Sequence, residues 1–398
     1  MNLKAVITPV CFIINAIAVI SCYALQEGKS SRQVDILYET KTFRSGSQNI
    51  DKSVDRFTVK NTWKLQLNKK NKFTLVMPWA KASLKSTRDG STIKDNVEGF
   101  KDLKVVHEMT TQKAKVGRDG VKWKFKLNLP NGKEQLNASE NNVTSAMGET
   151  GQGFSDPTYG KGLNLGFDFN LINKPTKSIT NNYTFGYTIN GSYSSLFGRT
   201  SYKKPGDNIV FNYMRNIKQS KKAKLSYGLG TNFTRRTVNY RPGGGTSANP
   251  SRFEGNIQVK YEKQRSKKLK EIMALKFQER GEIEVQESNG QIVRTLQGDR
   301  WTLNWTFNRK LNKKLSANYG LLGIFGGAND NLEVVSPTSG NATAKVGKDR
   351  NTRMEEVQLL YGRKHTINKH RQWFYNATLG ITDDSRDYTI GGGYIWKF

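Results

Sequence analysis

The stretch LNLGFDFNL, from Leu163 to Leu171, decides the fold. Its odd-numbered residues are all Leu or Phe, and Asn, Gly, Asp and Asn lie between them. A period of two predicts a strand with one apolar face and one polar face. In a soluble sandwich the apolar face packs on a core, whereas in a membrane barrel it meets lipid and the polar face lines the interior. The rest of the chain must decide between the two.

The N-terminus is typical of an export signal. Lys4 is the only charged residue before Glu27, and a long apolar core lies between them. The small residues of Cys22-Tyr23-Ala24 predict a cut after Ala24. The sequence therefore predicts a signal peptide over residues 1–24 and a mature domain over 25–398.

A second interpretation of the same segment stays open. The residues Val19 to Cys22 resemble a lipoprotein box, which would place a lipid on Cys22. Cys11 is the other cysteine of the chain, so a cut after Ala24 leaves a mature protein without cysteine. Such a chain has no disulfide, no thiol chemistry and no metal site built on cysteine.

The C-terminal stretch DYTIGGGYIWKF also alternates, counted back from Phe398. It resembles the closing strand of bacterial outer-membrane barrels, which ends in an aromatic residue. We interpret Tyr394, Trp396 and Phe398 as an assembly signal read by the barrel assembly machinery.

The alternating pattern recurs along the whole chain and predicts sixteen strands. They lie near 33–43, 54–68, 72–85, 100–112, 120–129, 161–172, 181–193, 207–217, 222–237, 252–264, 269–284, 299–309, 313–326, 353–364, 371–382 and 387–398. Their connections alternate between tight turns and long loops. The long loops are expected at 86–99, 130–160, 194–206, 238–251, 285–298 and 327–352.

This arrangement favours an all-β fold, a single antiparallel transmembrane β-barrel of about sixteen strands, with twelve to sixteen compatible with the pattern. Short turns are expected on the periplasmic side, together with both chain ends, and long loops on the outside. Asp168, in the middle of the opening stretch, would be costly toward lipid and ordinary toward water. Its odd-numbered neighbours are therefore predicted to face lipid, and the even-numbered ones a wet interior.

Three short stretches resemble the outer-membrane family named for the meta-pathway of phenol degradation, a group regarded as transporters. They are GFKDLKV at 99–105, LNLPNG at 127–132 and GQGFSDPTYG at 151–160. Asn131 stands where that family usually has Thr. The resemblance implies an exported barrel that passes small, aromatic molecules, and it names no substrate.

The charge of the chain is strongly basic, with 64 Lys and Arg against 33 Asp and Glu. Many of these cations lie in the expected tight turns, where they would meet anionic lipid headgroups of the outer membrane. An AT-rich genome, which enriches Lys and Asn alike, explains the excess equally well. An outer-membrane barrel rarely meets nucleic acid, so no nucleic-acid partner is expected.

A smaller set of lysines is predicted to point into the lumen. It consists of Lys60, Lys64, Lys122, Lys124, Lys126, Lys260 and Lys276. One hypothesis makes them a path that draws anions. The other pairs them with inward carboxylates, namely Asp168, Glu254, Glu262 and Glu356.

The chain offers little catalytic chemistry. Its three histidines, His107, His365 and His370, form no Ser-His-Asp pattern, and the two GGG stretches open no helix that could cradle a phosphate. We expect no enzyme, no cofactor and no metal site.

The sequence leaves three functions open for a barrel in the outer membrane of a Gram-negative type cell. The first is passive passage of small solutes with a preference for anions, with loop 130–160 folding inward to narrow the pore. The second is a narrower channel for hydrophobic or aromatic compounds. Its inner apolar residues would be Leu322, Ile324, Phe374 and Ile395. The third is a non-transporting surface or structural barrel.

Overall fold

The protein is described by a computed structural model. It describes residues 30–45, 50–88, 90–133, 135–148, 154, 158–193, 202–240, 246–249, 251–280, 282–286, 292–296, 299–326, 330–335, 342–346, 355–381 and 385–397. The expected signal peptide and Phe398 lie outside these residues.

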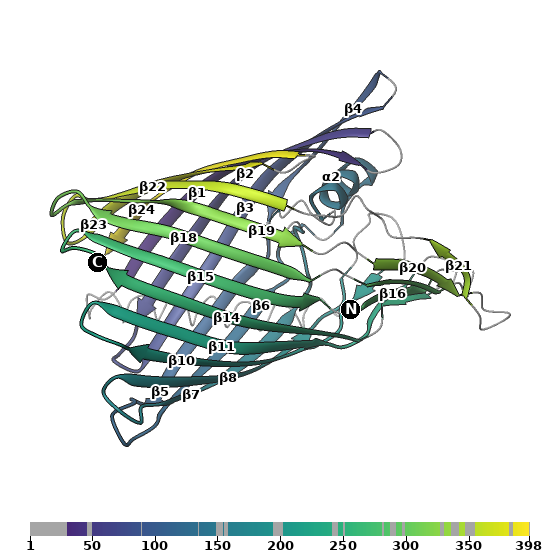
Figure 1. Ribbon diagram of the computed structural model, residues 1–398. Coiled ribbons are helices and arrows are strands. Elements are labelled where there is room, and N and C mark those ends of the chain that lie inside the picture. The colour runs from purple at the N-terminus through teal and green to yellow at the C-terminus, as the bar shows by residue number, and fades with distance from the viewer. Residues whose placement is uncertain are drawn as a thin grey trace.

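Sixteen antiparallel strands follow one another around a closed barrel (Figure 1). They are β1 (Ser30–Ser45), β2 (Ile50–Gln66), β3 (Asn71–Arg88), β5 (Leu103–Gln112), β6 (Gly120–Leu129), β7 (Asn164–Asn173), β8 (Ile179–Asn190), β10 (Asn208–Lys218), β11 (Ala223–Thr234), β14 (Arg252–Gln264), β15 (Leu269–Arg280), β18 (Arg300–Lys310), β19 (Leu315–Gly326), β22 (Glu355–Thr366), β23 (Arg371–Ile381) and β24 (Ser385–Lys397). β24 closes on β1, with Lys397 opposite Ser31. The predicted barrel of sixteen strands is confirmed.

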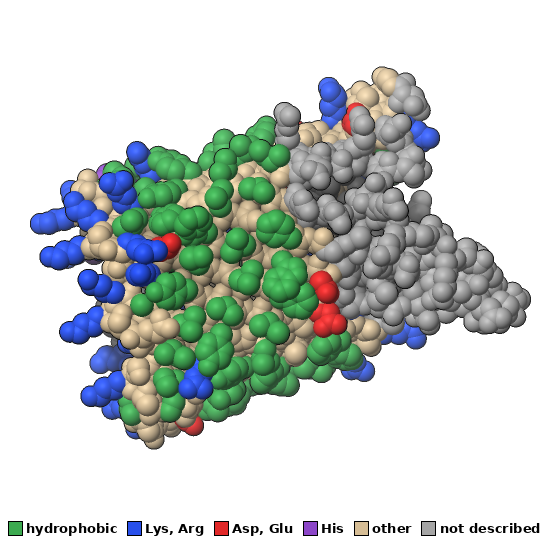
Figure 2. All heavy atoms as spheres, viewed as in Figure 1, with side chains coloured by type: hydrophobic (Ala, Val, Ile, Leu, Met, Phe, Trp, Pro, Cys, Tyr) green, Lys and Arg blue, Asp and Glu red, His purple; other side chains and the backbone are tan. Residues whose placement is uncertain are grey.

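The alternation of the sequence places apolar side chains on the outside of the barrel. Figure 2 shows a band of hydrophobic side chains across the face of the barrel that is in view, and the exposed apolar residues of the other strands continue it as a belt. Ile257 is 60% exposed and Ile390 is 58% exposed, far more than a soluble core would leave open. Trp123 packs against Phe169 with ring centroids 4.7 Å apart on the same outer face. This apolar belt is the surface that a membrane barrel presents to lipid.

The connections between the barrel strands are short at one end, and at the other end most are long, as predicted; the exceptions there are the short connections between β1 and β2 and between β23 and β24. The described chain both begins and ends at the short-turn end, since Ser30 lies opposite Leu65 and Ser31 opposite Lys397. Five of the short turns repeat one hydrogen-bond pattern.

The largest departure from the prediction concerns β3. Its first half pairs with β5 inside the barrel wall, and its second half pairs with β4 (Ser91–Phe100). The expected loop 86–99 is therefore wrong, because most of it forms β4 after a tight turn in which Gly90 has a φ of 79°. Between the pairs Trp79–Phe100 and Val76–Lys104, two residues of β3 lie opposite three residues of the partner, so Lys101 and Asp102 form a bulge.

A helix, α2 (Ala138–Gly148), lies within the expected loop 130–160 and packs against β2, β3 and β4. Asn137 and Glu140 cap its start reciprocally: Asn137 Oδ1 accepts from the Glu140 amide at 2.9 Å, and Glu140 Oε2 accepts from the Asn137 amide at 3.1 Å. The helix and the barrel wall share one buried apolar cluster. Its members are Val54, Ala80, Ala82, Leu84, Val97, Leu136, Val143, Ala146, Met147, Phe154 and Tyr159.

Other long loops form two small sheets at the same end of the molecule (Figure 1). One contains β9 (Tyr202–Lys204), β12 (Thr237–Tyr240) and β13 (Thr246–Asn249). The other contains β16 (Glu282–Gln286), β17 (Ile292–Leu296), β20 (Asp330–Val335) and β21 (Ala342–Val346). Within the described residues, no helix has the length and apolar character needed to cross a membrane.

Candidate functional site in the barrel lumen

The lysines predicted to point inward lie on the face opposite the apolar belt, and several are paired with carboxylates. Lys126 Nζ lies 2.7 Å from Asp168, and Lys124 Nζ lies 3.5 Å from Glu108. The alternation places both pairs on one strip of wall, because Lys124 and Asp168 are direct cross-strand partners. Positive and negative side chains therefore alternate along this part of the wall.

Three further lysines of the set also have partners. Lys60 Nζ lies 3.0 Å from Asp35 Oδ2, and Lys260 Nζ lies 2.7 Å from Glu262. Lys276 donates to Gln278 Oε1 at 3.3 Å.

The remaining two lysines of the set are different. Lys64 and Lys122 are exposed, and among the residues that the structure describes neither forms an ion pair.

A second group of charges is buried near the mouth of the barrel. Arg56 Nε donates to Glu39 Oε2 at 2.8 Å, and Lys41 Nζ lies 3.1 Å from Asp387. Phe154 covers both cations, with its ring centroid 4.9 Å from Arg56 Cζ and 5.4 Å from Lys41 Nζ. Buried charges are stable only when they are paired and hydrogen-bonded. This cluster, with Phe154 packed over it, attaches the connection between β6 and β7 to the inner face of the wall; its described residues, 130–133, 135–148, 154 and 158–163, are here called the inward segment.

Asp102, in the bulge between β4 and β5, holds the ends of that inward segment. Its carboxylate accepts hydrogen bonds from Asn128 Nδ2 at 2.7 Å, the Gly132 amide at 3.0 Å and the Lys161 amide at 2.7 Å. Its own amide donates to the Tyr159 carbonyl at 3.2 Å. Asp102 thus connects the end of β6 and Gly132 with the stretch Tyr159–Lys161 through its carboxylate and its own amide.

The contacts around Asp102, here called the Asp102 junction, explain why residue 132, in the stretch 127–132, is a glycine. A Cβ on Gly132 would lie 2.3 Å from the Tyr159 carbonyl oxygen and 2.7 Å from the Asp102 amide nitrogen, which leaves no room for a side chain. Asn131 also takes part, because its Oδ1 accepts from the Leu103 amide at 2.6 Å. The stretches 99–105, 127–132 and the described part of 151–160 therefore meet in space.

Tyr159 completes this junction from the loop side. Its hydroxyl donates to the Val97 carbonyl at 3.3 Å, and its ring lies 5.2 Å from Lys101 Nζ. Burial raises the pKa of the Tyr159 phenol well above its ordinary value, so the hydroxyl stays a donor.

A cavity of about 420 Å³ lies on the lumen side beside this junction. Four of its lining residues are cations, Arg56, Lys60, Lys101 and Lys104, whereas Asp35 is the one carboxylate among the described lining residues. Its apolar lining is contributed by Leu37, Val76, Pro78 and Phe374. Such a lining can hold an anionic group beside an apolar body.

The glycines at 391–393 make room for the apolar side of the cavity. A Cβ on Gly393 would lie 2.6 Å from Phe374 Cζ, and one on Gly391 would lie 2.9 Å from Leu37 Cδ1. Small residues on the inner face therefore let two large apolar side chains lie flat on the wall. This second GGG stretch serves packing, in agreement with the absence of a helix after it.

Sequence reasoning missed Arg56, Lys101, Lys104 and Asp102. Arg56 was detectable, because it shares the even-numbered phase of Lys60 and Lys64 on β2. Lys101 and Asp102 lie in the bulge between β4 and β5, which alternation alone does not locate, and Lys104 directly follows it as the second residue of β5.

The histidines lie apart from one another. His107 is on the outer face and stacks on Phe73 with ring centroids 4.2 Å apart, whereas His365 and His370 lie at the short-turn rim. Among the described residues there is no cluster of three or more metal-ligating side chains.

Comparison with known proteins gives structural likeness without a family. No family model and no curated protein matches the chain, so the resemblance to the phenol meta-pathway family is not confirmed. Solved structures that resemble it include an outer-membrane channel from Pseudomonas putida F1, with 10% identity, a TM-score of 0.38, and coverage of 93% of this chain and 96% of that chain. A FadL homologue from Pseudomonas aeruginosa has 6% identity, a TM-score of 0.46 and coverage of 93% and 90%.

A third neighbour is Pseudomonas putida OprB in its low-pH structure, with 7% identity, a TM-score of 0.42, and coverage of 94% of both chains. At identities of 10% or less and TM-scores below 0.5, these likenesses carry no conclusion about the function of this chain. The fold class rests on the closed barrel and its apolar belt.

Proposed function

We propose that the protein is an outer-membrane channel for the passive passage of small solutes. The observation that carries this proposal is the closed barrel of sixteen strands with an apolar belt outside and charged side chains inside. A barrel of that width is too large to be filled by its own wall side chains. Lys64 and Lys122, which are exposed and form no ion pair among the described residues, would give this passage a preference for anions.

The proposal includes the route to the membrane. Residues 1–24 act as an export signal that is cleaved, and the barrel assembly machinery reads Tyr394, Trp396 and Phe398. In support of this, Tyr394 and Trp396 stack on the outer face of the closing strand with ring centroids 4.2 Å apart.

A channel for hydrophobic or aromatic compounds is the second candidate, and one observation favours it. Phe374, Leu37, Val76 and Pro78 give the lumen cavity an apolar wall. The inward helix α2 and its flanking segment narrow the same end of the barrel, in line with the expectation for loop 130–160. A narrow, partly apolar passage would slow ions and admit small organic molecules.

Bilayer recordings of the purified barrel distinguish these candidates. The ion-channel proposal expects discrete conductance steps and, in a salt gradient, a reversal potential on the anion side. A barrel that shows no conductance steps but speeds the entry of a small aromatic acid into liposomes would favour the second candidate. A barrel that is silent in both assays contradicts transport and leaves the non-transporting hypothesis.

A further inference from the structure

Five of the short turns share one sequence pattern and one geometry. Each has Asn or Ser, then Lys, then Lys or His, at 68–70, 220–222, 266–268, 312–314 and 368–370. In each, two successive amides donate to the carbonyl of the residue that follows the turn. In Asn312, for example, Oδ1 also accepts from the amides of Lys314 and Leu315, both at 2.8 Å.

The two positions after the Asn or Ser are almost always lysine. Nine of these ten positions in the five turns are Lys, although Lys and Arg together make up only 64 of 398 residues. A genome-wide bias toward lysine would not confine it to these positions. Figure 2 shows the result, a rim of Lys and Arg side chains projecting from the short-turn end next to the apolar belt.

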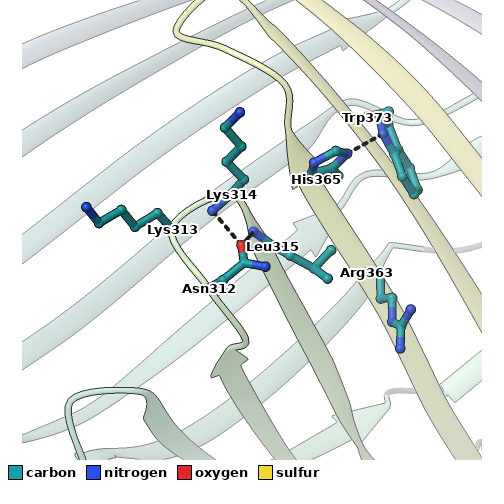
Figure 3. A pocket seen from close by; sticks show the side chains of 7 residues that line it. All are labelled: Asn312, Lys313, Lys314, Leu315, Arg363, His365 and Trp373. Carbon is teal, nitrogen blue, oxygen red and sulfur yellow. Dashed lines mark hydrogen bonds between the residues drawn. The ribbon is translucent and has the colours of Figure 1, made fainter.

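One of these turns borders a hollow of about 590 Å³ on the outer face (Figure 3). Asn312, Lys313, Lys314 and Leu315 line it from the turn, and Arg363, His365 and Trp373 line it from β22 and β23. The register sets Leu315, His365 and Trp373 side by side on the same face as the lipid-facing Leu359 and Tyr361. The hollow is therefore at the boundary between the apolar belt and the water.

The polar groups of this hollow are all hydrogen-bond donors. The Asn312 Oδ1 atom is occupied by two backbone amides, so its side-chain amide is left to donate. His365 Nδ1 accepts from Trp373 Nε1 at 2.9 Å, which places the proton of a neutral imidazole on Nε2. The other polar groups are Arg363, Lys313 and Lys314, and none of the described lining residues is a carboxylate.

A site with several donors, two or more cations and no carboxylate among its described lining residues fits a phosphate. Its neighbours fix what the phosphate is attached to. Tyr361, 40% exposed, lies one step further into the apolar belt than Arg363, and Trp373 forms the side of the hollow. Aromatic side chains beside cations at this depth match the boundary between headgroups and acyl chains.

We propose that this hollow binds the headgroup phosphate of an anionic phospholipid from the leaflet that meets the short turns. Arg363 and the two lysines neutralise the phosphate, and the Asn312 amide and His365 Nε2 donate to its oxygens. The acyl chains lie along the outer face toward Tyr361. The site does not rest on the proposed channel function, because it faces away from the lumen.

The test compares two variants that each lose three charges. The site variant carries Lys313→Gln, Lys314→Gln and Arg363→Gln, and the control carries Lys177→Gln, Lys221→Gln and Lys222→Gln in other short turns. Native mass spectrometry of the purified barrel counts bound phosphatidylglycerol, with phosphatidylcholine and inorganic phosphate as the other two arms. We expect one phosphatidylglycerol held tenfold or more weaker in the site variant, and less than threefold weaker in the control.

A third variant, Trp373→Phe, keeps the ring but removes the hydrogen bond that orients His365, and should weaken the lipid about threefold. Gel mobility before and after boiling shows whether each variant still forms the barrel. Equal weakening in the site variant and the control would overturn the proposal in favour of a diffuse charged rim. Displacement of phosphatidylglycerol by millimolar inorganic phosphate would also overturn it, since the site would then bind free anions.

Discussion

Two Lys–Asp ion pairs lie on the lumen side of the same barrel and differ in what covers them. Lys41 and Asp387 are 3.1 Å apart, and their side chains are 10% and 9% exposed beneath Phe154. Lys126 and Asp168 are 2.7 Å apart, and the lysine is 42% exposed on an open wall. The covered pair belongs to the junction with α2, and the open pair to a regular stretch of barrel.

The difference shows that alternation decides which side of the wall a side chain faces, whereas contacts with distant segments decide whether that side chain is covered. Alternation alone sends both lysines inward, and the two pairs are chemically the same. What distinguishes them is the segment after β6, which folds back over one part of the wall and not the other. Burial changes an ion pair from a weak surface contact into a group that cannot lose one partner without cost.

The largest effect should follow from cutting the junction itself. Asp102→Ala removes the acceptor of three hydrogen bonds, two of them from backbone amides. Each donor left buried without a partner costs roughly 1–3 kcal/mol, so we expect a loss of about 4 kcal/mol or more. Urea unfolding of the barrel in detergent measures it.

Asp168→Ala on the open wall is the matched control, with an expected loss of less than about 1 kcal/mol because its partner Lys126 is partly solvated. Similar midpoints for the two variants would show that Asp102 does not hold the inward segment.

The second effect compares the two ion pairs directly. Lys41→Met leaves Asp387 buried without its cation and should cost about 3–5 kcal/mol. Lys126→Met leaves Asp168, whose side chain is 13% exposed, without its cation but beside an uncovered lumen, and should cost less, about 1–2 kcal/mol. The same unfolding assay reports both values.

The double variant Lys41→Met with Asp387→Leu should recover most of the loss, because no unpaired charge remains. If the single variants at Lys41 and Lys126 unfold at the same urea concentration, Phe154 does not exclude water from the Lys41–Asp387 pair.

The regular wall was predictable because its physics is local. A period of two and the contrast between turns and loops were enough to locate all sixteen strands, and most boundaries agree within three residues. The outer face of the opening stretch and the inward Lys126–Asp168 pairing follow from the same alternation.

The end of the barrel that carries α2 was not predictable in the same way, because its structure depends on segments far apart in the sequence. A local signal for α2 did exist in the capping pair Asn137 and Glu140, and it was overlooked within the expected loop. No local pattern indicated that Asp102 would contact Gly132 and Lys161, or that Phe154 would cover Lys41. The cavity and its cations follow from those contacts.

The smallest effect concerns how the open wall acts on ions. Lys122, Lys124 and Lys126 form a column about 13 Å long at about 3.3 Å per residue. Their charges are felt over a Debye length of about 8 Å at physiological salt, so each influences only part of the lumen. Changing all three to Gln lowers the charge of the wall by three, and we expect a weaker anion preference. The reversal potential in a salt gradient measures it.

Recordings at lower salt concentration and a control variant of the covered Lys41–Asp387 pair test this last prediction further. Dilution lengthens the Debye length, so the difference between the original and the triple variant should grow as salt is lowered. The neutral double variant Lys41→Gln with Asp387→Asn should leave the reversal potential unchanged, because it removes one charge of each sign and lies under Phe154. If the triple variant also leaves it unchanged at every salt concentration, the column lies outside the conducting path. The lysines at 124 and 126 would then serve only to pair with Glu108 and Asp168.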